Sequence, residues 1–268
     1  MCLILFAWRT HPRYPLVLAA NRDEFHARPT AAAAFWDDAP QLLGGRDLEA
    51  GGTWLGVTRK GKFAAITNYR EPPESAPPQD HSRGQLVTDY LLGNASPLDY
   101  ARQIQANASA YRAYNLLLGD AENLIYTSNR RESATPVAAG IHGLSNHLLD
   151  TPWPKVCAGK ERLAGLLRED RVDPEALLRL LGDPQPVPGS EPPVFDRALA
   201  PEWTTRLSFI RSPVYGTRSS TVLLIGRDGE VVFVERQFDP QGRAVGTCDQ
   251  RFEIPVANVG YPRQSEHS

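Results

Sequence analysis

The segment MCLILFAW (Met1–Trp8) opens the chain, and a turn of sequence HPRYP separates it from a second apolar segment, LVLAA (Leu16–Ala20). Short apolar runs that are bounded by Pro-containing turns predict buried strands. Further along, WLGVT (Trp54–Thr58) and FAAIT (Phe63–Thr67) flank the polar turn RKGK, which predicts a β-hairpin. The first part of the chain is therefore expected to form a sheet.

Four helices are predicted between these strands and the last ones, and two further strands are predicted among them, over Asn115–Leu118 and Leu124–Thr127. Ser96 offers an N-cap, and Pro97 suits the first position of a helix. The other helices are expected after Ser82, over Lys155–Leu167, and over Pro174–Leu181 behind the cap Asp173. Thr221–Ile225 and Val231–Val234 then predict a second hairpin. This order predicts one α+β domain over residues 1–260, with a polar tail over 261–268.

The composition excludes several classes of function. Lys and Arg number 29 against 31 Asp and Glu, so a nucleic-acid partner is not expected. No apolar stretch approaches the ~20 residues of a membrane-spanning helix, and no basic region precedes the first apolar run, so a signal peptide is not expected either. Cys2, Cys157 and Cys248 have no metal-ligand spacing. We expect no metal site, and a cytoplasmic location.

Cys2 is a candidate nucleophile. A methionine before a small residue is normally removed, which would leave the thiol and the α-amine on one residue. Their reference pKa values are ~8.5 and ~7.7–8.0, so the amine can accept the proton of the thiol. An ordinary apolar role for Cys2 in its strand remains open at this stage.

Polar residues gather where apolar runs end. Asn21, Arg22 and Asp23 follow LVLAA, where an arginine beside a thiol favours the thiolate and Asp23 can orient an amine. Asn68 and Asn146 follow other apolar runs and can donate to an oxyanion. Arg218 can bind a carboxylate or phosphate. Each of these residues is equally compatible with a turn or a cap. The glycine pairs around Arg46 allow a ligand to approach the backbone.

Taken together, the motifs resemble the NRDE family, the relatives of transport and Golgi organization protein two, which is similar to the N-terminal-nucleophile (Ntn) hydrolases. The resemblance rests on Met1-Cys2, Asn21-Arg22-Asp23-Glu24, Gly44–Val57, Thr67-Asn68 with Arg70, Ser82–Val87, Tyr114–Asp120, His142–Val156 and Tyr215–Ile225. It implies a four-layer αββα sandwich in which Cys2 attacks an amide or acyl carbon. It also implies supporting roles for Arg22, Asp23, Asn68, Asn146 and Arg218.

The resemblance leaves the ligand open. Candidate ligand-binding residues are Asn21, Arg46, Trp54, Tyr69 and Arg70, with Trp153 and Tyr215 nearby, and the aromatic ones suit a core equally well. Catalysis on a small molecule needs no cofactor. The alternative is a non-catalytic protein that carries haem or an acyl-coenzyme A on the same fold. A third alternative is an interaction protein that uses the Pro-rich segments Glu71–Gln79 and Asp183–Phe195. The oligomeric state stays open.

Overall fold

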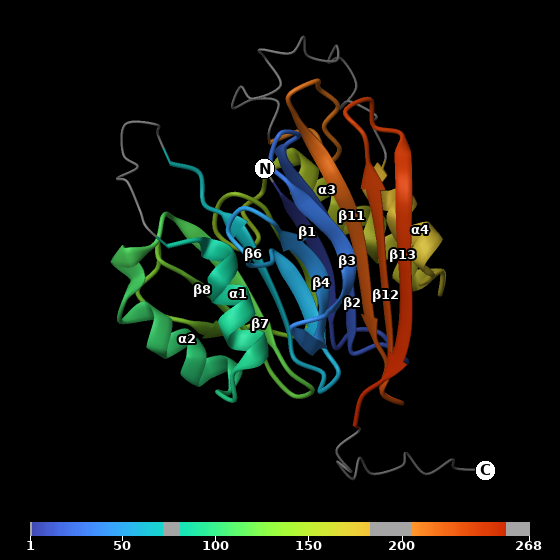
Figure 1. Cartoon of the computed structure of the whole chain (residues 1–268). Coiled ribbons are helices and arrows are strands. Elements are labelled where there is room, and N and C mark those ends of the chain that lie inside the picture. The colour runs from blue at the N-terminus through green and yellow to red at the C-terminus, as the bar shows by residue number, and fades with distance from the viewer. Residues whose placement is uncertain (1, 72–80, 183–204, 256–268) are drawn as a thin grey trace, which may run out of the picture.

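The computed structural model describes residues 2–71, 81–182 and 205–255, and these form two antiparallel sheets covered by helices (Figure 1). The six-stranded sheet has the order β10 (Gly140–Leu144), β1 (Leu3–Trp8), β2 (Leu16–Phe25), β11 (Tyr215–Ile225), β12 (Glu230–Phe238) and β13 (Ala244–Glu253). The seven-stranded sheet runs from β3 (Thr30–Trp36) through β4 (Ala39–Asp47), β5 (Leu55–Thr58), β6 (Phe63–Asn68), β7 (Tyr114–Gly119) and β8 (Leu124–Ser128) to β9 (Thr135–Pro136).

Each sheet carries helices on its outer face. Helices α3 (Pro154–Arg168) and α4 (Pro174–Gly182) pack on the six-stranded sheet, and α1 (Arg83–Leu92) and α2 (Pro97–Gln105) pack on the other, on the opposite side of the molecule (Figure 1). The fold is therefore a four-layer αββα sandwich, as the family resemblance implies. Ser96 accepts a hydrogen bond from the backbone of Asp99, and Asp173 accepts one from Ala176, which confirms both predicted caps.

Three apolar clusters fill the spaces between the four layers, and β1 contributes to two of them. Ile4, Phe6 and Trp8 pack between the sheets, whereas Leu3 and Leu5 pack under α3 and α4. Successive side chains of a strand point to opposite faces, so a strand buried on both faces reads as a continuous apolar run. The third cluster lies between the seven-stranded sheet and its helices.

Two sequence expectations are corrected. The strand predicted over Leu16–Ala20 does not end before the polar residues, because β2 continues through them to Phe25. Strands β3, β4 and β13 were not expected. In β13 exposed and half-buried residues alternate, because it is the edge strand of its sheet, so it lacks the apolar alternation of a core strand. The predicted tail 261–268 and residues 72–79 and 183–195 of the Pro-rich segments lie outside the described residues.

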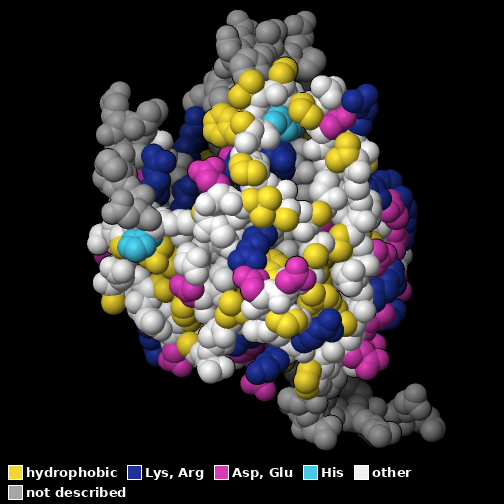
Figure 2. Space-filling model, viewed as in Figure 1, with side chains coloured by type: hydrophobic (Ala, Val, Ile, Leu, Met, Phe, Trp, Pro, Cys, Tyr) yellow, Lys and Arg dark blue, Asp and Glu magenta, His cyan; other side chains and the backbone are white. Residues whose placement is uncertain are grey.

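The surface has no single dominant charge on the face that Figure 2 shows, where basic and acidic side chains are interspersed. Within the described ranges, no helix is long and apolar enough to span a membrane.

Candidate active site

Cys2 lies immediately ahead of β1, the strand that pairs with β2 on one side and β10 on the other. The antiparallel register pairs Leu3 with Asn21 and Ile4 with Leu144, so the residue before β1 falls beside the later part of β2 and the end of β10. The start of β1, the end of β2 and the start of β11 therefore meet at one end of the six-stranded sheet (Figure 1).

Ser145 fixes the backbone of Cys2. Its hydroxyl donates a hydrogen bond of 2.7 Å to the Cys2 carbonyl oxygen and contacts the side-chain oxygen of Asn146 at 3.1 Å. The Ser145 carbonyl in turn accepts a bond of 2.6 Å from the Thr67 hydroxyl, which Asn115 contacts at 3.2 Å. These buried groups join the end of β10 to the seven-stranded sheet and hold Cys2 between them.

The environment of the thiol opposes its ionisation. Burial raises the pKa of the Cys2 thiol, and the negative charge of Asp23 acts in the same direction. A hydrogen bond from the Asp23 backbone and the positive charge of Arg22 lower the pKa in part. A reactive thiolate at this position therefore depends on nearby positive charge.

Asp23 is a buried carboxyl group, only 4% exposed. Its Oδ1 accepts a hydrogen bond of 2.6 Å from the Thr217 hydroxyl, and its carbonyl oxygen accepts one of 3.2 Å from the Tyr215 hydroxyl. Burial raises the pKa of Asp23, against the opposing effects of Lys155 and Thr217. The hydrogen bond from Thr217 to Asp23 follows from strand pairing, because β2 and β11 are neighbours and Thr217 lies opposite Asp23.

The two predicted oxyanion donors lie together. Asn146 is buried, and its Nδ2 donates a hydrogen bond of 2.9 Å to the carbonyl oxygen of Asn68. The side chain of Asn68 is exposed at the end of β6. Since Ser145 links Asn146 to the Cys2 carbonyl, the Asn146 side chain and the backbones of Asn68 and Cys2 belong to one hydrogen-bonded assembly.

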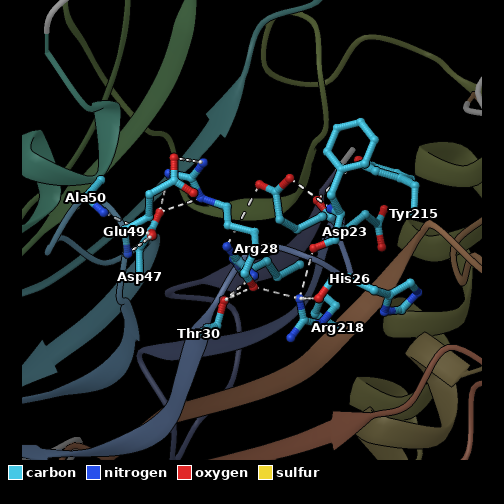
Figure 3. A network of polar contacts seen from close by, with 12 residues as sticks. Asp23, His26, Arg28, Thr30, Asp47, Glu49, Ala50, Tyr215 and Arg218 are labelled. Carbon is cyan, nitrogen blue, oxygen red and sulfur yellow. Dashed lines mark hydrogen bonds and ion pairs between the residues drawn. The ribbon is translucent and has the colours of Figure 1, made fainter.

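The two predicted arginines lie on adjacent strands. Arg22 is buried on β2, with Glu24 at 3.8 Å and the Thr30 hydroxyl at 3.4 Å. Arg218 occupies an irregularity in β11, where the register with β2 shifts between Thr217 and Ser219. Such bulges redirect a side chain. The Nη1 of Arg218 donates to the carbonyl oxygens of Phe25, His26 and Arg28, at 2.9, 3.3 and 3.1 Å, so it holds the turn after β2 (Figure 3).

This turn continues into a charged network (Figure 3). Arg28 binds Asp47 at 2.8 Å and Glu49 at 3.4 Å, which ties the turn to the end of β4. Burial lowers the pKa of Arg218, and the charge of Arg22 lowers it further. The guanidinium groups of Arg22 and Arg218 therefore interact with one another, and the carboxylate of Glu24 acts on both.

The candidate ligand-binding residues have different surroundings. Asn21 is fully buried: its Nδ2 donates to the carbonyl oxygens of Ser208 and Leu181, and its Oδ1 accepts from Ser220. Arg46 binds Asp38 through both terminal nitrogens and lies over the ring of Trp36. Trp54 packs against two of the apolar clusters. Of the set, Tyr69 and Arg70 lie nearest to Asn146, because they directly follow Asn68.

Tyr69 and Trp153 flank His147 beside this assembly. The Tyr69 hydroxyl lies 2.9 Å from Nε2 of His147, and the ring of Trp153 is 6.0 Å from that of His147. Tyr215 stacks edge-on against Phe25 at 5.1 Å. Two of the aromatic residues singled out in the sequence thus lie next to Asn146, whereas Trp54 belongs to the core.

The glycine pairs serve backbone packing. A Cβ atom at Gly52 would lie 2.6 Å from the carbonyl carbon of Gly84, so only glycine permits this contact between the loop before β5 and the start of α1. The contact fixes the start of α1, where Arg83 donates to the carbonyl oxygen of Ala113 at 3.2 Å. Negative charge on Cys2 raises the pKa of Arg83 against the effect of burial. The sequence analysis did not select Arg83 as a site residue.

Sequence reasoning also missed Ser145 and Lys155. Lys155 is 2% exposed. Burial lowers the pKa of its amine, and negative charge on Asp23 and Cys2 raises it in part. A signal was present, because Lys155 falls on the same stripe of α3 as Val156, Gly159 and Leu163. A lysine on the apolar stripe of a helix departs from the usual pattern. No group of three His, Cys, Asp or Glu side chains able to hold a metal occurs in the part of the chain that the structure describes.

Comparison with known proteins identifies the family of the chain. A family model described as "Transport and Golgi organisation 2" matches residues 1–240. The chain is 37% identical over 259 residues to the Transport and Golgi organization protein 2 homolog of Bos taurus, and 35% identical to that of Homo sapiens, covering 88% of this chain and 92% of each relative. The Transport and Golgi organization protein 2 of Drosophila melanogaster is 30% identical over 90% of this chain and 95% of its own.

Solved structures are more distant. An N-acylethanolamine-hydrolyzing acid amidase ortholog of Caenorhabditis elegans aligns at 11% identity with a TM-score of 0.48, over 83% of this chain and 92% of that chain. A C2A mutant of conjugated bile acid hydrolase from Clostridium perfringens aligns at 10% identity with a TM-score of 0.42, over 97% and 100%. Similarity at this level says nothing about chemistry, which has to be argued from the residues of this chain.

Proposed function

The chain belongs to the Transport and Golgi organisation 2 family, and we propose that it acts as a hydrolase or acyl-transfer enzyme on a small amide or thioester, with Cys2 as the nucleophile. The observation that carries this proposal is the placement of Cys2. Its thiol lies beside the buried carboxyl group of Asp23, and Ser145 holds its backbone at 2.7 Å. A thiol that is held in place among buried polar groups at the end of a strand is suited to nucleophilic attack.

In the proposed reaction, Sγ of Cys2 attacks the carbonyl carbon and forms a C–S bond, while the bond from that carbon to the leaving nitrogen or sulfur breaks. Removal of Met1 would allow the α-amine of Cys2 to accept the thiol proton and pass it to the leaving group. Water then hydrolyses the thioester, or another acceptor takes the acyl group.

The neighbours of Cys2 have assigned roles in this proposal. Asp23 orients the amine. Asn68 and Asn146 donate to the oxyanion, for which Nδ2 of Asn146 has a second hydrogen besides the one bonded to Asn68. Arg22 and Arg218 supply the positive charge that attracts an anionic substrate. We place the reaction in the cytoplasm, where the three free thiols stay reduced.

The rival proposal is a protein that carries haem or an acyl-coenzyme A without reacting with it. The aromatic residues beside Asn146, Tyr69 and Trp153, favour an apolar or planar ligand in either case. The two proposals differ in their dependence on the sulfur of Cys2, because binding without a reaction does not require a nucleophile.

Mass spectrometry of the intact purified protein is the first test, because retention of Met1 would exclude the α-amine of Cys2 as the base. The protein is then incubated with a series of acyl-N-acetylcysteamine thioesters and N-acyl amides, and both the acid released and the acyl adduct on Cys2 are measured. Wild type and Cys157→Ala, which removes an exposed thiol, should both react, whereas Cys2→Ala should lose the adduct and the turnover. Equal turnover in Cys2→Ala would overturn the proposal, and haem or acyl-coenzyme A binding that survives Cys2→Ala, without turnover in wild type, would support the rival.

A further inference from the structure

Lys155 is a buried lysine that the proposed reaction leaves without a role. It is the second residue of α3, directly after Pro154, and it is 2% exposed. It lies on the face of the helix that carries Val156, Gly159 and Leu163, which packs against the six-stranded sheet. Lysine side chains are almost never fully buried unless a partner compensates the charge.

Stability does not account for this lysine. Its Nζ has no hydrogen-bond partner among the residues that the structure describes, and the ring centroid of Trp153 is 6.0 Å away, at the outer limit of a cation–π contact. An amine buried without a hydrogen bond disfavours the folded state. A cation in the first turn of a helix also opposes the helix dipole. A residue that is unfavourable on both counts is expected to have a function.

Helix α3 packs on β1 and β10, with Gly159 against Leu5 and Val156 against Gly143, so Lys155, one turn ahead of Gly159, lies toward the start of β1, where Cys2 stands. Burial lowers the pKa of the Lys155 amine to about 8, and negative charge on Asp23 of β2 and on Cys2 opposes that effect. The positive charge of the amino terminus and that of Arg22 of β2 also lower the pKa of the thiol, and negative charge on Cys2 raises the pKa of Arg83 of α1. Lys155 differs from both arginines because it acts on Asp23 as well as on the thiol.

We propose that Lys155 supplies the positive charge that stabilises the thiolate of Cys2 when the thiol loses its proton. A buried thiolate is an anion in a medium of low dielectric constant, where an ammonium group nearby interacts with it far more strongly than it would in water. The same ammonium compensates the buried carboxylate of Asp23. Lys155 is thus a positioning residue that acts through Cys2. The inference rests on the proposed role of Cys2 as a nucleophile, but ionisation of the thiol can be measured without any substrate.

The test is the rate at which iodoacetamide alkylates Cys2 between pH 6 and pH 10, followed by mass spectrometry of the N-terminal peptide. In Lys155→Met, the rate at pH 7.5 should fall by about tenfold or more, and the midpoint of the pH profile should rise by about one unit. Alkylation of the exposed Cys157 in the same sample is the internal reference. Lys160→Met is the matched control, because Lys160 lies on the same helix but binds Asp150, at 2.7 Å. Its profile at Cys2 should equal that of wild type.

Methionine has a similar volume to lysine, and a thermal melt monitored by circular dichroism checks that Lys155→Met is folded before its alkylation is compared with that of wild type. Identical alkylation profiles at Cys2 in Lys155→Met and wild type would overturn the inference. A second measurement needs no variant at Lys155. The chain has only four lysines, so their side-chain NMR signals can be titrated individually.

In this titration, Lys155 should have the lowest pKa of the four lysines, and Cys2→Ala should lower it further, because the neighbouring anion is lost. A Lys155 titration that Cys2→Ala leaves unchanged would contradict the inference. Absence of turnover on every substrate would overturn the proposed function and leave both of these measurements intact, so the two failures are distinguishable.

Discussion

The hydroxyl of Ser145 donates a 2.7 Å hydrogen bond to the carbonyl oxygen of Cys2, so a residue that follows β10 holds the residue that precedes β1. Ser145→Ala leaves this oxygen and that of the Asn146 side chain without the hydroxyl. We expect a loss of about 1–3 kcal/mol in the free energy of unfolding, measured by urea denaturation. Ser212→Ala is the control, because the Ser212 hydroxyl is buried but has no hydrogen-bond partner among the described residues. Equal losses in both variants would contradict the prediction.

Asn21→Ala should destabilise the protein by more than about 2 kcal/mol. The substitution leaves the carbonyl oxygens of Ser208 and Leu181 without their donor and the hydroxyl of Ser220 without its acceptor, all of them buried. Urea denaturation measures the change, with the exposed Asn94→Ala as a control that should differ little from wild type. A variant as stable as wild type would leave Asn21 available for the ligand-binding role that the sequence suggests.

Arg218→Met should loosen the turn after β2. The arginine donates to three carbonyl oxygens of that turn, at Phe25, His26 and Arg28, and methionine cannot replace these bonds. Amide hydrogen exchange at residues 26–28 should become about tenfold faster, which corresponds to about 1.4 kcal/mol of local opening. Arg243→Met removes an exposed arginine that pairs with Asp239 and should leave this exchange unchanged. Unaltered exchange in Arg218→Met would free Arg218 for substrate binding alone.

His142 and Asp150 should make stability depend on pH in a defined direction. The hydrogen bond to Asp150 raises the pKa of His142, so its contribution is present below the unfolded pKa of ~6.5 and is lost as pH rises through the folded value. Although burial opposes it, hydrogen bonds from His142, Lys160 and the Gly143 backbone lower the pKa of Asp150 to about 2. Its contribution is present above ~3.9 and is lost as pH falls toward 2.

The measurement is the melting temperature of wild type and His142→Asn from pH 3 to pH 9. The advantage of wild type should be largest between about pH 4 and 6.5 and should shrink on both sides. His26→Asn is the matched control with the opposite sign, because burial lowers the pKa of His26 and its neutral form is favoured in the folded state. A constant difference between wild type and His142→Asn across this range would contradict the prediction.

Most strands and helices could be predicted from apolar patterns, and the four layers from the family resemblance, whereas polar residues inside strands could not be predicted. A strand such as β1 is buried on both faces and is therefore recognisable in the sequence as a continuous apolar run. Asn21 and Asp23 are equally buried in β2, but their side chains find hydrogen-bond partners on β11, which lies about 200 residues later in the chain. A local sequence pattern does not reveal such a distant partner, so the apolar pattern alone predicts a strand that ends at Ala20.

The same distinction between local patterns and distant partners separates the site residues that the sequence could predict from those that it could not. Cys2, Asp23 and Asn146 stand at the ends of apolar runs and could be selected from the sequence. Lys155 was overlooked although it lies on the apolar stripe of α3, because the groups around its amine depend on how that helix packs against the sheet. Arg218 was selected, but its hydrogen bonds to the turn after β2 follow from an irregularity in pairing that only the structure reveals.

The pairing of β2 with β11 has a consequence during synthesis of the protein on the ribosome. Cys2 and the strands around it are made first, but their neighbour in the sheet leaves the exit tunnel only after residue 225 has been translated. Until then β2 has one open edge and Asp23 lacks the hydroxyl of Thr217. Nascent chains released before this point would present an unpaired strand to other chains, which is a recognised route to aggregation. Cys2 therefore acquires its complete surroundings only after β11 has been synthesised.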